Sequence, residues 1–197
     1  MNDQQLKALN ELLANFVAHS SHAGDALQHA TRIQTFVANV GRPWSRTTLT
    51  GHLTASAWVL DGSRTHVALI HHKKLNRWLQ PGGHIDDSDA SWRAAAQRET
   101  TEETGLAQFL AQPGDDALFD VDVHAIPARP DEPAHFHYDL RFLLLTDVDA
   151  TQHSTLAINL DESHDCRWFA LTALAADASN EVSMLRMIEL SIRQFPG

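Results

Sequence analysis

The sequence has a single cysteine and no long apolar run, and each absence excludes a class of protein. Cys166 has no second cysteine with which to form an internal disulfide, whereas disulfide-stabilised secreted domains carry several. The longest strongly apolar run, FLLL at 142–145, is far shorter than the ~20 residues that cross a membrane. The first residues, MNDQQLKALNEL, show no basic segment followed by an apolar one, as a secretory signal would. We therefore expect a cytoplasmic protein with no membrane partner.

Basic residues are also scarce. The chain has 15 Lys and Arg against 25 Asp and Glu, a formal net charge of −10, and its basic residues form no cluster. Such a surface repels nucleic acid, so we expect no nucleic-acid partner. If the substrate is instead a small phosphate compound, a divalent cation must supply the neutralising charge. What the chain does have is 197 residues of which 43% are hydrophobic, enough for one domain with its own core.

The first forty residues predict two helices. Apolar residues recur there at helical spacing, namely Leu6, Leu9, Leu13, Phe16 and Val17, then Leu27, Ala30, Ile33, Phe36, Val37 and Val40. We assign residues 1–45 to an N-terminal helical extension and residues 46–197 to the main domain. The apolar stripes are typical of helices that pack on a core or against a second copy of the chain, and a homodimer is one of these two alternatives.

From about residue 50 the hydrophobic period changes to that of strands. Strands are predicted at 54–60, 65–71, 118–126, 135–145 and 166–171, with a helix at about 90–104. The segment 180–195 predicts a last, amphipathic helix with one apolar side made of Val182, Leu185, Ile188, Ile192 and Phe195. This order favours an α/β (α+β) fold, a mixed β-sheet sandwiched between helices.

The segment RETTEETG, at 98–105, crowds three like charges into a helix. On a helical wheel Glu99, Glu102 and Glu103 share the face of the apolar residues that precede them, whereas Thr100 and Thr104 fall opposite. At about 5 Å and an effective dielectric constant near 20, each pair of carboxylates costs roughly 3 kcal/mol. The face therefore needs a cation, and carboxylate oxygens are hard ligands that suit Mg²⁺ or Mn²⁺. Arg98 stands four residues before Glu102 and can hold its carboxylate, and Gly105 predicts a left-handed helix end.

The segment 82–106 resembles the Nudix box, G-x5-E-x7-R-E-U-x-E-E-x-G-U, in which U is aliphatic. The matching residues are Gly83, Arg98, Glu99, Glu102, Glu103, Gly105 and Leu106. Two positions depart from the pattern. Asp89 replaces the early acid, with eight residues instead of seven between it and Arg98, and we interpret it as a helix N-cap. Thr100 stands at the first aliphatic position.

The resemblance implies an activity and a set of site residues. Nudix enzymes hydrolyse a diphosphate linked to another moiety, commonly a nucleoside diphosphate, with Mg²⁺ or Mn²⁺. By position, Glu99, Glu102 and Glu103 would ligate metal together with the carbonyl of Gly83, and Arg98 would complete the catalytic group. The metals would neutralise the diphosphate, polarise a phosphoryl oxygen and lower the pKa of the attacking water. The general base varies within the family, and two residues qualify here, Glu99 and Glu162.

A histidine-rich pair of strands is the second feature with chemical potential. Polar residues alternate onto one face of each strand, with Asp120, Asp122 and His124 on the first and His135, His137, Asp139 and Arg141 on the second. The turn PARPDEP would join them as a hairpin. Two interpretations stand level: His124, His135, His137 and Asp139 contact the substrate, or they stitch a half-exposed sheet together. Protonated histidines would add the positive charge that the composition lacks. His84 follows the double glycine and would lie near the diphosphate.

Two rival functions share the resemblance. One is a non-catalytic nucleotide-binding Nudix module that acts as a sensor or regulator. Such modules typically lose box glutamates, and this chain keeps all three. The other is an isomerase on the same fold, which needs a reactive cysteine early in the sheet; Cys166 lies late in the chain and is interpreted as a packed residue. The predicted partner is a small diphosphate, a nucleotide derivative whose base and sugar the sequence does not select.

Overall fold

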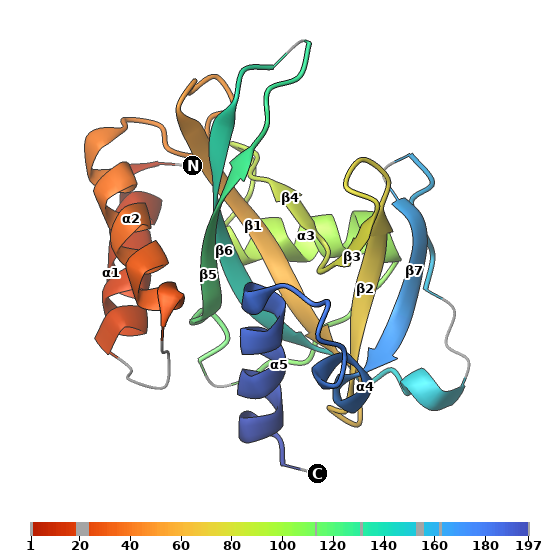
Figure 1. Ribbon diagram of the computed structural model, residues 1–197. Helices are drawn as coiled ribbons and strands as arrows, with labels where there is room; N and C mark the ends of the chain where they lie inside the picture. Colours follow the sequence, from red (N-terminus) through yellow and green to blue (C-terminus); the bar gives the residue numbers. More distant parts are fainter. Residues whose placement is uncertain are drawn as a thin grey trace. The chain divides into compact units, whose positions relative to one another are not determined.

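The computed structural model describes residues 2–18, 24–112, 114–130, 132–152, 156–161 and 163–196. Its elements (Figure 1) follow in the order α1 (Asp3–Ala18), α2 (Asp25–Asn39), β1 (Gly51–Leu60), β2 (His66–His72), β3 (Arg77–Leu79), β4 (Gly82–His84), α3 (Trp92–Thr104), β5 (Leu118–Ile126), β6 (His135–Leu145), the 3₁₀ turn η1 (Ala150–Gln152), β7 (Ser163–Ala170), α4 (Leu171–Ala175) and α5 (Val182–Gln194). Every helix and strand predicted from the sequence is present. Among the described residues, no helix combines the length and apolarity needed to cross a membrane.

The strands form a mixed sheet with helices, so the predicted fold class is confirmed. Their hydrogen-bonded order is β3-β2-β1-β6-β5, with β4 paired to β1 and β7 paired to β2. The chain forms two compact units. The first contains Met1–Ser56, Gly83–Ala96 and Asp116–Phe142, and the second contains Ala57–Gly82, Gln97–Asp115 and Leu143–Gly197. Strands β1, β4 and β6 and helix α3 contribute residues to both units.

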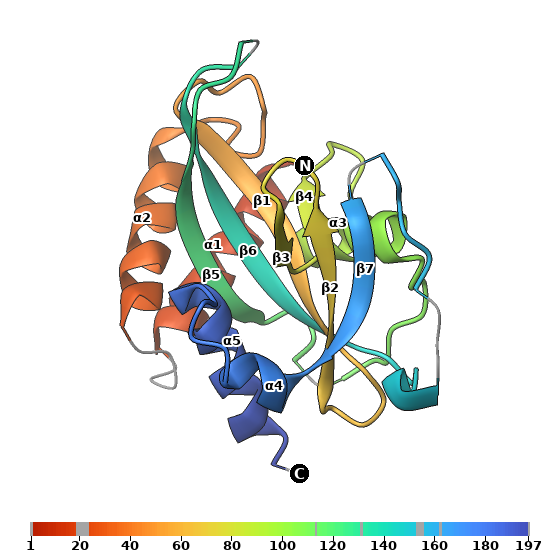
Figure 2. The same ribbon diagram turned by 45° about the vertical axis from the view of Figure 1, so that its right-hand side comes forward.

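In the first unit, α1 and α2 pack on each other and on β5 (Figure 2). The buried residues of the two helices are Leu9, Leu13, Phe16, Ala26, Ala30, Ile33, Phe36 and Val37. Phe36 stacks on Tyr138 of β6 with ring centroids 4.0 Å apart and planes 9° from parallel. The predicted apolar stripes therefore serve packing within the chain, and Val17, at the edge of one stripe, remains exposed.

Helix α1 also fixes the loop that leads into α3. The side chain of Gln5 donates hydrogen bonds to the backbone oxygens of Asp89, at 3.2 Å, and Ala90, at 2.9 Å. In return, the indole N–H of Trp92 donates to the backbone oxygen of Gln5, at 2.9 Å. The backbone oxygens of this loop lie outside the strands and helices, and these two take hydrogen bonds from α1. Helix α1 therefore contributes to the position at which α3 begins.

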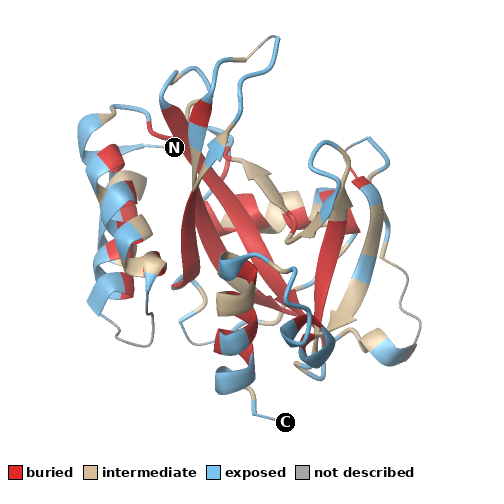
Figure 3. Ribbon diagram, in the orientation of Figure 1, coloured by how far each residue is buried: buried red, intermediate tan, exposed pale blue. Residues whose placement is uncertain are grey.

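A buried charge network lies between β5 and β6. Arg141 donates to Asp120 and Asp139, each at 3.0 Å, and lies 3.2 Å from Asp122. The hydroxyls of Thr54, at 3.0 Å, and Ser56, at 2.7 Å, also donate to Asp139. Burial alone would lower the pKa of Arg141, but the three carboxylates outweigh it and raise that pKa further. The network thus consists of groups that pair with one another within the buried part of these strands (Figure 3).

In the second unit, β2 pairs antiparallel with the end of β1, with β3 and with β7. Helix α5 buries Met184, Met187, Ile188, Leu190 and Ser191. The predicted apolar side of this helix is wrong, because Val182 and Ile192 are exposed. The reason is a polar contact that a hydrophobic pattern does not contain: the indole of Trp58 donates a 2.8 Å hydrogen bond to Ser191, which turns the serine inward.

Candidate functional site: an acidic helix and a histidine cluster

Helix α3 carries the three glutamates, and its two ends explain its length. At the start, the Ser91 hydroxyl accepts a hydrogen bond from the N–H of Ala94, at 3.1 Å, which is the contact of an N-cap. The predicted N-cap at Asp89 is therefore wrong. Its carboxylate instead accepts from the N–H of Asp86, at 2.8 Å, and closes a turn within the loop.

The end of α3 follows the prediction. Gly105 has φ +73°, in the left-handed region, and its N–H donates to the carbonyl of Thr101, at 2.9 Å. A Cβ added to Gly105 would lie 2.6 Å from the Cβ of Ala157. Glycine is thus required here twice, once by the backbone angle and once by the close approach of the next loop.

The inward face of α3 differs from the helical-wheel prediction. Glu103 is 2% exposed, but the Glu102 side chain is 52% exposed, and Glu99 lies between these extremes. Thr100 and Thr104, predicted on the outer face, are fully buried. The burial of Thr104 is tolerated because its hydroxyl donates to the Thr100 carbonyl, at 2.6 Å, within the helix. Thr100 therefore occupies the inward position that the Nudix box fills with an aliphatic residue.

The carboxylates of α3 are held by two groups of the second unit. The N–H of Gly82, at the start of β4, donates to Glu103 at 2.8 Å. Arg98 donates to Glu99 at 2.8 Å and to Glu102 at 3.3 Å. Hard oxygen donors of this kind fit Mg²⁺ or Mn²⁺. The three carboxylates are not close enough together to count as a metal-ligand group. Among the described residues, the one group of three potential ligands whose atoms lie within 4.8 Å of one another consists of histidines.

Two other predicted site residues on this side stay predictions. Gly83 lies on β4, directly after Gly82, and is half-buried. Glu162, the second candidate for the general base, lies outside the described residues.

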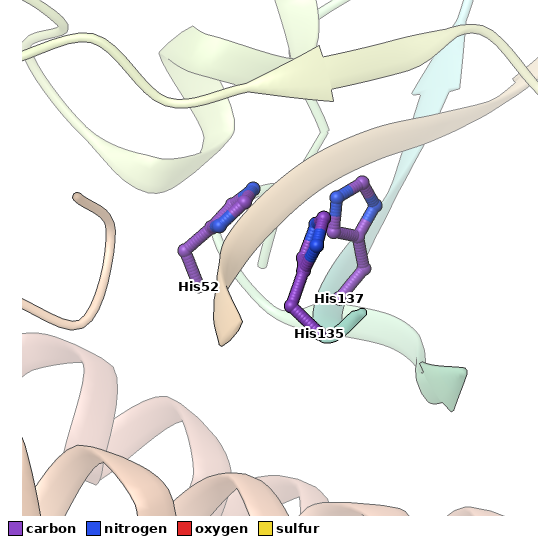
Figure 4. A group of neighbouring side chains, drawn as sticks. All are labelled: His52, His135 and His137. Atoms are coloured by element: carbon purple, nitrogen blue, oxygen red, sulfur yellow. The ribbon is translucent and has the colours of Figure 1, made fainter. Parts of the chain in front are cut away.

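Five histidines of the first unit lie close together, and we call them the histidine cluster: His52, His84, His124, His135 and His137. The ring centroid of His137 lies 4.8 Å from His52, 5.1 Å from His135, 5.5 Å from His124 and 5.6 Å from His84. The predicted hairpin is confirmed, since β5 pairs antiparallel with β6 and places His124 opposite His137. Figure 4 shows His52 beside His135 and His137.

His52 is the member that the sequence prediction missed. The strand was predicted to begin at Thr54, but β1 begins at Gly51. His52, Thr54 and Ser56 then alternate onto one face, the face on which both hydroxyls bind Asp139. The signal was present in the sequence as polar residues at every second position before the apolar run began.

Two histidines of the cluster, His52 and His137, have lowered pKa values. Burial, reinforced by the neighbouring imidazoles, lowers the pKa of His137 to about 2. Burial, with His135 and Arg46 nearby, lowers the pKa of His52 to about 4. For His137 this direction disfavours the hypothesis that protonated histidines neutralise a phosphate, and the hypothesis stays a prediction. A buried imidazole without a carboxylate partner is held neutral.

Asp139 and His124 occupy different environments. Asp139 is buried and accepts hydrogen bonds from Thr54, Ser56 and Arg141, which favours the interpretation that it stitches the strands together. His124 is more exposed and its Nδ1 lies 3.0 Å from Asp122. Burial opposes ionisation of Asp122, but His124 and Arg141 outweigh it and hold the pKa of Asp122 well below its usual value.

Cys166 lies half-buried on β7 of the second unit. Burial, with the charges of Glu103 and Asp165, raises the pKa of its thiol to about 12. A thiol with such a pKa is a poor nucleophile, which agrees with its interpretation as a packed residue.

An open pocket elsewhere in the second unit contains none of these residues. Its lining includes Arg64, Thr65, Leu110 and Asp147. We give it no role in the chemistry, because it brings together neither the glutamates of α3 nor the histidines.

Comparison with known proteins identifies the family. The model of the NUDIX domain matches residues 50–190. The chain belongs to the NUDIX-domain family. A search of curated proteins finds no match to this NUDIX-domain chain.

Solved structures show the same fold at low sequence identity. A NUDIX-family hydrolase from Clostridium perfringens is 22% identical with a TM-score of 0.50, covering 73% of this chain and 97% of that one. A MutT protein from Methanosarcina mazei Go1 is 13% identical with a TM-score of 0.50, covering 76% and 99%. The dihydroneopterin triphosphate pyrophosphohydrolase of E. coli is 12% identical with a TM-score of 0.50, covering 72% and 95%.

Proposed function

We propose that this NUDIX-domain protein is a hydrolase that cleaves the diphosphate bond of a nucleoside diphosphate linked to another moiety, with Mg²⁺ or Mn²⁺. The observation that carries the proposal is the state of the box carboxylates. Glu103 is buried and oriented by the N–H of Gly82, while Arg98 contacts both Glu99 and Glu102. Three acids kept together on one helix at an electrostatic cost are explained by a cation that they bind.

Each residue then has a role. Glu99, Glu102 and Glu103 would hold the cation with the carbonyl of Gly83, and Arg98 would keep two of the carboxylates in place. When bound, the cation would neutralise the diphosphate and acidify the attacking water. Glu99 or Glu162 would accept the proton of that water.

His84 and His124 are our proposed substrate contacts among the histidines. Neutral imidazole still carries one N–H, and that N–H can donate a hydrogen bond to a phosphate or ribose oxygen. The Asp122 carboxylate lies 3.0 Å from Nδ1 of His124 and favours a proton on that nitrogen. This interaction would fix the tautomer that the substrate meets.

The test is a phosphate-release screen over nucleoside diphosphate derivatives with Mg²⁺ and Mn²⁺ supplied separately. Dihydroneopterin triphosphate belongs in the panel, because the E. coli structural neighbour is named for it. We expect turnover of at least one compound, its loss in chelator and its return with either metal. Full turnover in chelator would contradict the metal mechanism. Tight binding of a nucleotide with no turnover would favour the sensor function instead.

A further inference from the structure

Two buried histidines of the first unit have ring nitrogens without hydrogen-bond partners. His52 is 1% exposed, and neither its Nδ1 nor its Nε2 has a partner. His135 is 7% exposed, and its Nε2 has none. An unsatisfied buried polar atom costs about 1–3 kcal/mol and is uncommon in folded proteins. Two such rings side by side, with centroids 5.1 Å apart, indicate that a ligand completes them.

The hydrogen bonds of His135 define which of its nitrogens offers a lone pair. Its Nδ1 lies 2.9 Å from the carbonyl oxygen of Pro133. A carbonyl only accepts, so Nδ1 carries the proton and, in the neutral ring, Nε2 presents its lone pair. A ring that donates one N–H to a backbone carbonyl and aims the other nitrogen at an ion is the usual arrangement of a metal-binding histidine.

The third member of the group is His137, two residues along β6. One nitrogen each from His52, His135 and His137 lie within 4.8 Å of one another (Figure 4). His52 lies on β1 and the other two rings on the neighbouring strand β6, and side chains on one face of adjacent strands can approach this closely. An ion about 2.05 Å from each nitrogen would draw the three atoms to about 3.3 Å apart, a movement within reach of side-chain rotation.

We propose that His52, His135 and His137 form a metal site for a borderline ion such as Zn²⁺. Imidazole nitrogens suit Zn²⁺, whereas Mg²⁺ requires oxygen ligands, so this site differs in chemistry from the carboxylates of α3. The Glu132 carboxylate, 3.7 Å from Nε2 of His135, contributes negative charge that favours a cation. The positive charge of Arg46, near His52, disfavours a cation. Three ligands leave a fourth position of a tetrahedral ion for water or another donor.

The site does not depend on the proposed hydrolase activity, because its ligands lie outside the Nudix box.

The experiment measures Zn²⁺ binding to the full chain by equilibrium dialysis with metal analysis, and Co²⁺ binding by its visible absorption. We expect one tightly bound Zn²⁺ per chain. His52→Asn, His135→Asn and His137→Asn should each weaken binding at least about 100-fold, since each removes one of three ligands. The matched control is His164→Asn, which alters an exposed histidine of the second unit and should leave the affinity unchanged. Glu103→Gln should also retain Zn²⁺.

Binding that survives all three histidine variants, or that is lost equally in His164→Asn or in Glu103→Gln, overturns the proposal, as does the absence of tight Zn²⁺ binding to the wild type. Because a substitution in a buried cluster can unfold the protein, the wild type provides an independent measurement. Crystals grown with Zn²⁺ should show an anomalous scattering peak among the three rings. A well-ordered water there, with anomalous signal only at α3, overturns the assignment.

Discussion

The acidic helix α3 and the histidine cluster both gather potential metal ligands, but under opposite electrostatic conditions. On α3 the ligands are carboxylates that repel one another, and Arg98 and the N–H of Gly82 offset part of that repulsion. In the histidine cluster His52 and His137 have pKa values far below neutral pH, so these two rings bring no repulsion between charges. The cost in this cluster is instead the absence of hydrogen-bond partners on the nitrogens of His52 and His135.

The difference teaches how to recognise two kinds of binding site. A group of like charges is visible in the sequence, because charge is a property of the residue type. A group of buried, uncharged ring nitrogens without hydrogen-bond partners is visible only in the structure, because the partners of each nitrogen are decided by how the chain folds. The following predictions test whether the two regions behave as differently as their electrostatics require.

Glu103→Gln should lower turnover by at least about 100-fold while the protein stays folded. The substitution removes a charge that would bind the cation, and its amide oxygen can still accept from Gly82. Steady-state rates with Mg²⁺, beside melting temperatures with and without metal, make the measurement. Glu189→Gln, which changes an exposed glutamate of α5, is the control and should change neither. If Glu103→Gln unfolds the chain but leaves the folded fraction fully active, the carboxylates of α3 are structural.

Arg141→Met should lower the free energy of unfolding by about 3–5 kcal/mol, because it leaves buried carboxylates without their cation. Arg141 contacts Asp120, Asp122 and Asp139. Denaturant unfolding provides the value. The control, Arg167→Met, removes an exposed arginine paired with Asp165 and should change stability by no more than about 0.5 kcal/mol. If Arg141→Met lowers the free energy of unfolding by less than about 1 kcal/mol, the charge network does not stabilise strands β5 and β6.

In chelator, the free energy of unfolding should fall between about pH 7 and pH 4, by roughly 3 kcal/mol for each of two buried histidines. The pKa of His52 is about 4 and that of His137 about 2 in the folded protein, both below the ordinary 6.5. The unfolded chain therefore binds more protons below pH 6.5, and stability is lost as the pH falls through that range. Asp122 adds a loss only below its ordinary pKa of 3.8, so the measurement stops at pH 4.

The comparison of His52→Asn with His164→Asn sharpens the pH prediction. His52→Asn removes one of the depressed pKa values and should flatten the dependence, whereas His164→Asn should keep the wild-type slope. Equal slopes in all three proteins would show that the histidine cluster is not buried and neutral as described.

The smallest effect is expected at the end of α3. Gly105→Ala should cost about 1–2 kcal/mol of stability, because φ is +73° and the added Cβ would meet Ala157. Gly41→Ala is the matched control: a Cβ there meets nothing within 4 Å. Thermal unfolding of both variants checks the prediction. If both behave alike, the left-handed end of α3 is not needed to place the carboxylates.

The sequence predicted most of the elements because their periodicity is long enough to read. Helices α1 and α2 and the hairpin of β5 with β6 each span nine residues or more. Strands β3 and β4 have three residues each and were missed. No alternation can be recognised over three residues, and such strands form because a neighbouring strand offers hydrogen bonds.

Side-chain direction was predicted less well than element type. The wheel of α3 was centred on the glutamates, but the buried face is centred on Ala96, Thr100 and Glu103. Threonine was read as polar, although within a helix its hydroxyl can bond to the preceding turn and then be buried. Ser191 in α5 repeats the lesson, since its contact with Trp58 joins residues 133 apart in the chain. Pairings of this kind are set by the tertiary structure.

The lone thiol of Cys166 gives the protein a built-in reporter. Burial raises the pKa of this thiol to about 12, so it is protonated at neutral pH and alkylating reagents and mild oxidants should react with it slowly. Reaction would accelerate once β7 separates from β2, where Cys166 pairs with Ile70. The rate of labelling would then measure how often this part of the sheet opens, with no engineered probe and no second cysteine to confuse the signal.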